Sequence, residues 1–578
     1  MARIWIAVGL LLVFAALDAQ QLVRSHLEPK VGSVKYDFRQ KLPARRGSIF
    51  DCRDRPLVES IPVWDYRLDP VSLTNRLGTA YGPARTVEAV SRTIAMMLKL
   101  DYAKVLKMTG NFRNQYQFLG TSSDPQAHDI IADRKMVAGV MIEERDVRTY
   151  LNGRLLAHVL GSVNSKGNGL GGIEQRYNSQ LTGIPGEIHG MRDALKRELY
   201  DKRIVSVAPV TGASVYLTVD STLQYEVETV LADGVGEYGA ARGWSIVMDA
   251  HSGAILAMAC YPDFDPADGG MGERDSLRIN RACAHAYEPG SVMKVITAAA
   301  AVEAGLVTPD TLYPTNRDDE RYYRLPGDGR HVWEPQMSIR DAIVHSSNIV
   351  IGKLGCDLGP ERLWTSMRAF GFGECTQVEL PAESAGILPH WKKWHMIKWS
   401  RAPIGQGVSV TALQLCSAYQ AIANDGERMR PHLVRRVVAA DGSELYRHID
   451  VVCGRPISAM TARTVREMMC GVAKKGGTAP RAAIPGYSIA AKTGTAQKLV
   501  NGRYSETLHV ATFCGMVPAT EPELVILVSL DFDRPTKCHQ GGNSSALMWR
   551  KIAEKAICYL RIAPDQLSEL LEHEDAAR

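Results

Sequence analysis

The stretch Tyr287–Lys294 reads YEPGSVMK and continues without a break into Val295–Val302, VITAAAAV. The alanine-rich run predicts a helix, and Pro289-Gly290 predicts a turn immediately before it. Ser291 and Lys294 are three positions apart, so their side chains share one face at the start of that helix. Backbone N–H groups and the positive end of the helix dipole favour developing negative charge there. The pattern therefore indicates a serine nucleophile with a lysine as its base.

A lysine accepts the proton of a serine hydroxyl only if its own pKa is lowered, either by burial or by a second cation nearby. Lys492 is the candidate for that cation, since it opens the motif Lys492-Thr493-Gly494-Thr495 at the end of a predicted strand. Thr493 and Thr495 are candidates for binding a terminal carboxylate beside Lys492. Gly494 has no side chain and lets a substrate lie against the strand backbone.

A third motif, Ser346-Ser347-Asn348, lies between the other two in the chain. Ser346 is a candidate for relaying a proton between Lys294 and a leaving amine, and Asn348 for holding a substrate amide. The backbone N–H groups of Ser291 and Thr495 are the expected oxyanion hole.

The combination of motifs is more specific than any one of them. Ser291 is the only serine with a lysine three residues later, and Lys-Thr-Gly occurs once. Ser-x-Asn is weaker, because Ser162-Val163-Asn164 also matches it, although upstream and out of order. The three motifs in this order are the set found in penicillin-binding proteins and serine β-lactamases.

The apolar runs around these motifs predict an α+β fold. Two strand-like runs joined by Ala250–Gly253 precede the long helical middle, and three more follow it. We expect one antiparallel five-stranded sheet, closed by long-range pairing and covered by helices. The predicted strands are Trp244–Asp249, Ala254–Cys260, Tyr487–Ala491, His509–Val517 and Glu523–Phe532.

The amino terminus carries an apolar run, Ile4–Leu17, which extends to residues 4–23 if Leu22 and Val23 are counted. Its length fits either the core of a cleaved signal peptide or a membrane helix, and a buried core helix is a third reading. Arg24 and further lysines follow the segment, so a positive-inside count would place the bulk of the chain in the cytoplasm.

Composition excludes several classes of protein. The net charge of the 578 residues is only +5, which argues against a nucleic-acid binder recognised by basicity. The eleven cysteines contain no CxxC pair, so neither a zinc site nor a disulfide framework is supported, and most are expected to be small buried hydrophobes. No metal ligands and no cofactor are predicted.

Beyond the three motifs, the chain resembles class B penicillin-binding proteins from residue 46 to about residue 550. The stretches that carry the resemblance are Arg46–Asp51, Gly172–Glu174, Asn280–Ala282, Tyr287–Ser291, Gly371–Gly373, Glu379–Pro381 and Ile404–Gly407. Arg55–Val63 and Asp69-Pro70 look more like the division-specific septal enzyme than the elongation enzyme, whereas Cys52–Arg55 departs from the family's usual Asp-Arg-x-Gly.

The resemblance implies peptidoglycan D,D-transpeptidation through an acyl-serine at Ser291, which β-lactams also acylate. It implies a single-pass protein of the bacterial inner membrane with an extracytoplasmic, periplasmic catalytic domain, and as partners stem peptides, a membrane peptidoglycan polymerase and other division proteins. The implied organisation is a membrane anchor at 4–23, a noncatalytic dimerisation or pedestal domain at 24–225 with mixed α/β structure, a transpeptidase domain at 226–562 and an acidic tail at 563–578.

Three alternatives stay open on the residues alone. They are the elongation-specific transpeptidase, a serine hydrolase of the β-lactamase or carboxypeptidase type, and a membrane β-lactam sensor or division scaffold.

Overall fold

A computed structural model describes residues 37–71, 73, 87–111, 116–132, 139–192, 198–268, 275–318, 321–322, 325–328, 333–536 and 539–567. The segment predicted as a membrane anchor, residues 4–23, lies outside these ranges. Within them, no helix is both long enough and apolar enough to cross a membrane.

The chain divides into two compact units, and the smaller contains residues up to Ala44 together with Ile184–Val210. Its described part is a three-stranded antiparallel sheet in the order β1-β6-β7. These strands are β1 (Asp37–Leu42), β6 (Gly186–Arg192) and β7 (Glu198–Val207).

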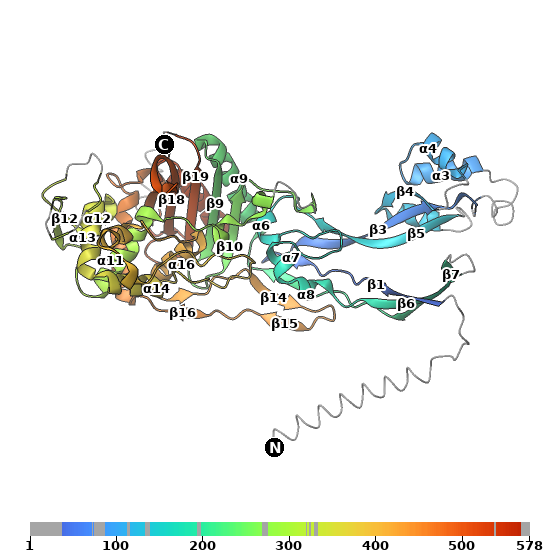
Figure 1. The fold of residues 1–578 in the computed structure, drawn as a ribbon, viewed down its shortest axis with the longest axis horizontal. Coiled ribbons are helices and arrows are strands. Elements are labelled where there is room, and N and C mark those ends of the chain that lie inside the picture. The colour runs from blue at the N-terminus through green and yellow to red at the C-terminus, as the bar shows by residue number, and fades with distance from the viewer. Residues whose placement is uncertain are drawn as a thin grey trace, which may run out of the picture. The chain divides into compact units, whose positions relative to one another are not determined.

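The larger unit, Arg45–Gly183 with Thr211–Arg578, contains the predicted five-stranded sheet in the order β10-β9-β19-β18-β17, and every neighbouring pair is antiparallel (Figure 1). The central strand β19 is an apolar run with all nine residues buried, as expected for a strand covered on both faces. The five strands are β9 (Arg242–Asp249), β10 (Ile255–Tyr261), β17 (Ala490–Val500), β18 (Arg503–Val517) and β19 (Leu524–Phe532).

Helices cover both faces of this sheet, which confirms the predicted fold class. Helices α9 and α18 pack together on one face, and α16 packs against β9 and β19 on the other; Figure 1 shows α9 and α16 on opposite sides of the strands. The helices from the sheet onward are α9 (Ser221–Tyr238), α10 (Arg281–Ala284), α11 (Met293–Glu303), α12 (Ile339–Val344), α13 (Asn348–Leu358), α14 (Pro360–Ala369), α15 (Met396–Arg401), α16 (Ala412–Ala423), α17 (Ala459–Cys470) and α18 (Ser545–Leu560).

A second sheet of seven strands lies mostly in the segment before α9. Its order is β15-β14-β8-β2-β3-β4, with β5 paired to β3, and only the β2–β8 pair is parallel. Its strands are β2 (Ile49–Phe50), β3 (Pro56–Leu68), β4 (Gln117–Ser122), β5 (Val140–Tyr150), β8 (Ser214–Leu217), β14 (Val434–Val438) and β15 (Glu444–Arg447). This sheet therefore joins strands from both sides of the predicted boundary at residue 225.

The remaining elements are short or lie at the edges of the unit. A small separate core lies between β3 and β4 and the helices α3, α4 and α5. These elements are α3 (Val87–Met97), α4 (Tyr102–Thr109), α5 (Pro125–Ala132), α6 (Ala157–Leu160), α7 (Gly172–Arg176), α8 (Asn178–Thr182), β11 (Leu312–Pro314), β12 (Gln336–Ser338), β13 (Arg428–Met429) and β16 (Val452–Gly454).

Several predicted boundaries differ from the structure. The strand expected at Tyr487–Ala491 begins at Ala490 and runs to Val500, because polar residues after the Lys-Thr-Gly motif form a long hairpin with Arg503 onward. The predicted domain boundary at 225/226 falls inside α9, whose N-cap is Asp220.

The start of the predicted acidic tail is part of the folded unit. Asp565 accepts hydrogen bonds from the backbone N–H of Ser488 and the hydroxyl of Thr520, both at 2.8 Å. The backbone N–H of Gln566 donates to the carbonyl of Gly486 at 3.0 Å. Residues 568–578 lie outside the described residues.

The expectation for the cysteines is wrong. Among the ten described cysteines, which are all free thiols, four are buried, three are half-buried and three are exposed. Most of them are therefore not fully buried hydrophobes.

Candidate active site

Ser291 lies in a single 3₁₀ turn, η3 (Gly290–Val292), directly before α11. Gly290 adopts φ +59°, and a Cβ there would lie 3.3 Å from the Cβ of Ala496 on β17. The Gly290 N–H donates to the carbonyl of Gly405 at 3.2 Å. A glycine is thus required both by the left-handed conformation and by the close approach of β17. The turn holds the half-buried Ser291 against that strand.

Lys294 is completely buried one turn further along. Its ammonium group donates to the carbonyl oxygen of Ser346 at 2.5 Å and lies 3.1 Å from the Ser346 hydroxyl. Burial lowers the pKa of Lys294 to about 7, and the carboxylate of Asp328 opposes this shift. Near neutral pH a large fraction of Lys294 is therefore uncharged and able to accept a proton.

Ser346 has an unusual backbone, with φ +61° at a residue that carries a side chain. Such a conformation costs about 1–3 kcal/mol and persists only where the surroundings impose it. Here it directs both oxygen atoms of Ser346 toward Lys294. Ser346 is therefore held in position to exchange a proton with that amine.

Asp328 is a site residue that the sequence motifs do not reveal. Its carboxylate accepts hydrogen bonds from the hydroxyl of Ser347 at 2.6 Å and from the backbone N–H groups of Asn348 and Ile349 at 2.5 and 3.2 Å. It also accepts from the indole N–H of Trp333 at 2.9 Å. A negative charge at the start of α13 is favoured by the helix dipole. Asp328 thereby fixes the Ser-Ser-Asn loop beside Lys294.

Asn348 follows in the same loop with a half-buried side chain. Its side-chain amide nitrogen donates to the carbonyl of Gly327 at 2.8 Å. The segment that contains Asp328 therefore holds both the backbone and the side chain of Asn348.

The Lys-Thr-Gly-Thr motif lies on β17, beside the turn that carries Ser291. A Cβ on Gly494 would lie 3.1 Å from the carbonyl oxygen of Pro289, so only glycine permits this approach. Thr495 is exposed, and its hydroxyl accepts a hydrogen bond from the N–H of Gly541 at 3.2 Å. Gly541, in the stretch before α18, is a second neighbour of the site that the motifs did not indicate.

Lys492 is buried completely behind the motif. Its ammonium group donates to the carbonyl of Thr493 at 3.2 Å and lies 3.4 Å from the Thr493 hydroxyl, which itself donates to Thr478. Burial, and then the charge of Lys294, hold the pKa of Lys492 well below its usual range. The two lysines are thus coupled, and protonation of one disfavours protonation of the other.

The structure brings the eight predicted residues into one neighbourhood. Ser346 contacts Lys294 directly, Asn348 is tied to the loop beside it, and the strand with Lys492, Thr493, Gly494 and Thr495 packs against the turn with Ser291. The predicted lowering of the lysine pKa is present, with burial as its main cause.

An Asp328→Asn variant should alter the pH dependence of acylation. Asparagine keeps an oxygen acceptor for α13 but loses the charge that raises the pKa of Lys294. We expect the acidic limb of the acylation profile to move to lower pH, and the rate at pH 8 to fall about tenfold because a charge-assisted interaction is lost. The measurement is the second-order rate constant for a fluorescent penicillin between pH 5 and 8.5.

Asp318→Asn, at an exposed position nearby in the chain, is the matched control and should change neither quantity. An acidic limb that stays in place or moves to higher pH would contradict the role given to Asp328.

Comparison with known proteins identifies the family to which this arrangement belongs. The penicillin-binding-protein transpeptidase domain family matches residues 243–554, and the penicillin-binding-protein dimerisation domain family matches residues 41–217. Penicillin-binding protein PbpB of Mycobacterium tuberculosis is 33% identical over 548 residues, which cover 88% of this chain and 77% of the relative. Peptidoglycan D,D-transpeptidase FtsI of Escherichia coli is 28% identical and covers 95% of this chain and 89% of the relative.

A solved structure supports the same assignment. Penicillin-binding protein 3 of M. tuberculosis, crystallised with aztreonam, superposes with a TM-score of 0.67 at 29% identity and covers 91% of this chain and 98% of that one. The matched domains, their order and the degree of identity together place the chain among the class B penicillin-binding proteins.

Proposed function

We propose that this chain is a peptidoglycan D,D-transpeptidase, in which Ser291 is the nucleophile and Lys294 its base. The observation that carries the proposal is the buried Lys294, one turn from Ser291, with a pKa near 7 and a hydrogen bond to Ser346. A neutral amine in that place accepts the hydroxyl proton as Ser291 attacks the carbonyl of the D-Ala–D-Ala bond of a stem peptide.

The reaction runs in two balanced halves. The bond from the Ser291 oxygen to the carbonyl carbon forms and the peptide C–N bond breaks, while the proton taken by Lys294 passes through Ser346 to the departing D-Ala amine. An amine of a neighbouring strand then attacks the acyl-serine: the new C–N bond forms, the bond between the carbonyl carbon and the Ser291 oxygen breaks, and the proton of the amine passes through Lys294 to that oxygen, which restores the hydroxyl and leaves Lys294 neutral.

The remaining motif residues bind the substrate. The terminal carboxylate lies beside Lys492, Thr493 and Thr495, and its negative charge counteracts the lowering of the Lys492 pKa. Asn348 holds a substrate amide, and the peptide lies against Gly494. The N–H groups of Ser291 and Thr495 stabilise the tetrahedral oxyanion. β-Lactams enter the same site and acylate Ser291.

The rate of acylation should depend on pH through Lys294. Because its pKa is about 7, the neutral, proton-accepting form is lost as the pH falls below 7. We expect the second-order rate constant for penicillin acylation to decrease about tenfold for each pH unit below 7 and to level off above 8. Circular dichroism at each pH separates this titration from unfolding. A rate that is flat between pH 5.5 and 8 would contradict the assignment of Lys294 as the base.

We place the enzyme at the division septum, anchored by residues 4–23 in the inner membrane with its catalytic part outside the cytoplasm. The similarity to PbpB and FtsI and the sequence features of Arg55–Val63 support this assignment. Its partners are then a membrane peptidoglycan polymerase and other division proteins. Division arrest with continued elongation on depletion of the chain, together with recovery of the protein in the membrane fraction, tests the role and the location.

The activity itself is tested with the purified full chain and peptidoglycan strands that carry pentapeptide stems. We expect cross-linked dimers to form and penicillin to abolish them. Release of D-Ala without dimers would indicate a carboxypeptidase, and rapid turnover of penicillin would indicate a β-lactamase; either result would overturn the proposal.

A further inference from the structure

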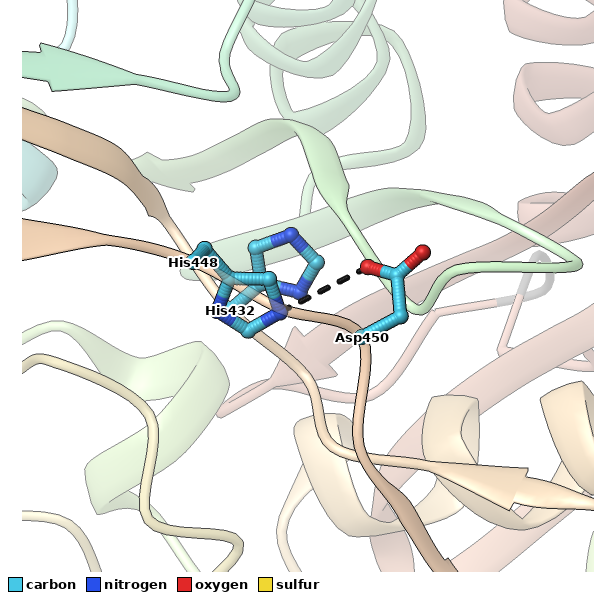
Figure 2. A group of neighbouring side chains, drawn as sticks. All are labelled: His432, His448 and Asp450. Carbon is cyan, nitrogen blue, oxygen red and sulfur yellow. Dashed lines mark ion pairs between the residues drawn. The ribbon is translucent and has the colours of Figure 1, made fainter.

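A second group of chemically competent side chains lies outside the site described above. Figure 2 shows His432, His448 and Asp450 gathered at one end of the β14–β15 hairpin. His432 precedes β14, whereas His448 and Asp450 follow β15. One nitrogen of each imidazole and one carboxylate oxygen of Asp450 lie within 4.8 Å of one another.

The two imidazoles are stacked and largely shielded from solvent. Their ring centroids are 3.5 Å apart and the ring planes differ by 11°. Only 4% of His432 and 7% of the His448 side chain are exposed. The buried Nε2 of His448 makes no hydrogen bond within the described part of the chain, and an oxygen of Asp450 lies 3.6 Å from it. A buried polar atom without a partner is costly, so this nitrogen points to a missing ligand.

The other nitrogen of each ring is already held. The Nδ1 of His432 lies 3.3 Å from the carbonyl oxygen of Arg430, and the Nδ1 of His448 lies 3.3 Å from the hydroxyl of Tyr446. Metal-bound histidines in proteins commonly have one ring nitrogen fixed in this way while the other binds the ion. The Nε2 atoms therefore carry the lone pairs that are available to a metal ion.

The backbone that carries the histidines is pinned at both ends of the group. The N–H of Ile255 on β10 donates to the carbonyl of His432 at 3.0 Å, and the N–H of His448 donates to the carbonyl of Arg435 at 2.8 Å. Asp450 is freer, because 56% of its side chain is exposed. The backbone is thus held while the side chains can rotate, so the two rings can turn out of their stack and Asp450 can approach to surround an ion.

The surrounding charges favour a cation. The carboxylates of Asp450 and Asp249 interact electrostatically with His432, and Asp450 also with His448, whereas the opposing charge of the Arg430 guanidinium acts on His448.

We propose that His432, His448 and Asp450 bind one divalent transition-metal ion, for which Zn²⁺ has the best-matched ligand set. Two imidazole nitrogens and a carboxylate suit Zn²⁺, Co²⁺ or Ni²⁺ rather than Mg²⁺ or Ca²⁺, which take oxygen ligands. Tetrahedral Zn²⁺ with bonds of about 2.0–2.2 Å brings its ligand atoms to about 3.3 Å from one another, which requires a modest contraction of this group. The fourth position is left to water.

Such an ion would link the two ends of the β14–β15 hairpin beside the β9–β10 turn. The sequence pattern predicts no metal ligands here, because the histidines are 16 positions apart and match no familiar spacing. The two residues become neighbours only when β14 and β15 pair.

The test uses the purified full chain, freed of metal by chelation and then titrated with Zn²⁺ by calorimetry and with Co²⁺ by absorption spectroscopy. We expect one saturable site per chain and visible d–d bands without the thiolate charge-transfer band that cysteine ligands produce. His448→Gln and Asp450→Asn should each weaken binding at least about tenfold, and Zn²⁺ should raise the thermal midpoint of the wild type but not of these variants.

Two matched controls separate this site from adventitious binding. His251→Gln replaces an exposed histidine in the neighbouring β9–β10 turn, and Cys453→Ser removes an exposed thiol three residues after Asp450; both should bind as the wild type does. Labelling by fluorescent penicillin verifies that each variant is folded. Equal affinity in the wild type and His448→Gln, loss of binding in Cys453→Ser, or the absence of a saturable site would overturn the proposal.

Discussion

A Ser291→Ala protein is expected to lose covalent labelling by fluorescent penicillin and to form no cross-linked peptidoglycan. The substitution removes the hydroxyl proposed as the nucleophile, in the turn that packs against β17. We expect the rate of acylation to fall by at least about 10⁴-fold, which corresponds to about 5 kcal/mol in transition-state stabilisation. Gel fluorescence after incubation with the penicillin measures the label directly.

The fold should survive this change, because Ser291 is half-buried and alanine is a good helix former. Ser276→Ala, at an exposed serine in the 3₁₀ turn Asp275–Arg278, is the matched control and should label at the wild-type rate. Label that persists on Ser291→Ala would show that another residue is the nucleophile.

Replacing Lys294 with methionine should be almost as damaging to acylation. Methionine fills the buried space but cannot accept the proton of Ser291, and we expect the acylation rate to fall about 10²–10⁴-fold. Lys294→Arg should not restore the rate, because a guanidinium stays charged at every accessible pH. Stopped-flow acylation of the purified variants, between pH 6 and 9, measures both effects.

The pH profile distinguishes a chemical role from a packing role. Residual acylation in Lys294→Met should lose the titration near pH 7, whereas a thermal midpoint close to that of the wild type would show that the core is intact. If Lys294→Arg acylates at the wild-type rate, the lysine acts as a fixed charge and not as a base.

Much of the fold follows from local patterns in the sequence. The runs Trp244–Asp249 and Glu523–Phe532 are apolar enough to predict buried strands, and both are strands in the five-stranded sheet. The long strand β17 was predicted too short, because its second half is polar and is stabilised by pairing with Arg503 onward, a contact that no local pattern records.

In the candidate site, too, some residues could be predicted from local sequence patterns and others only from long-range contacts. Residue type and spacing were sufficient to select Ser291 and Lys294, because both lie on one turn of helix. Asp328 carries no motif, and its influence on Lys294 arises from a loop that closes over the start of α13. The relation between Ser291 and Lys294 is set by their spacing within four residues of the chain. The relation between Asp328 and Lys294 is set only when the chain has folded.

The sequence by itself selected the candidate nucleophile, the order of the three motifs, most of the strands that surround them, and through the motifs the family. The tertiary structure alone decided the lowered pKa values of Lys294 and Lys492, the strained backbone of Ser346, the contribution of Asp328 and the contact between His432 and His448. The physical reason is that periodicity and spacing act along the chain, whereas burial and charge act through space. A pKa near 7 for Lys294 exists only because residues far apart in the sequence exclude water from its amine.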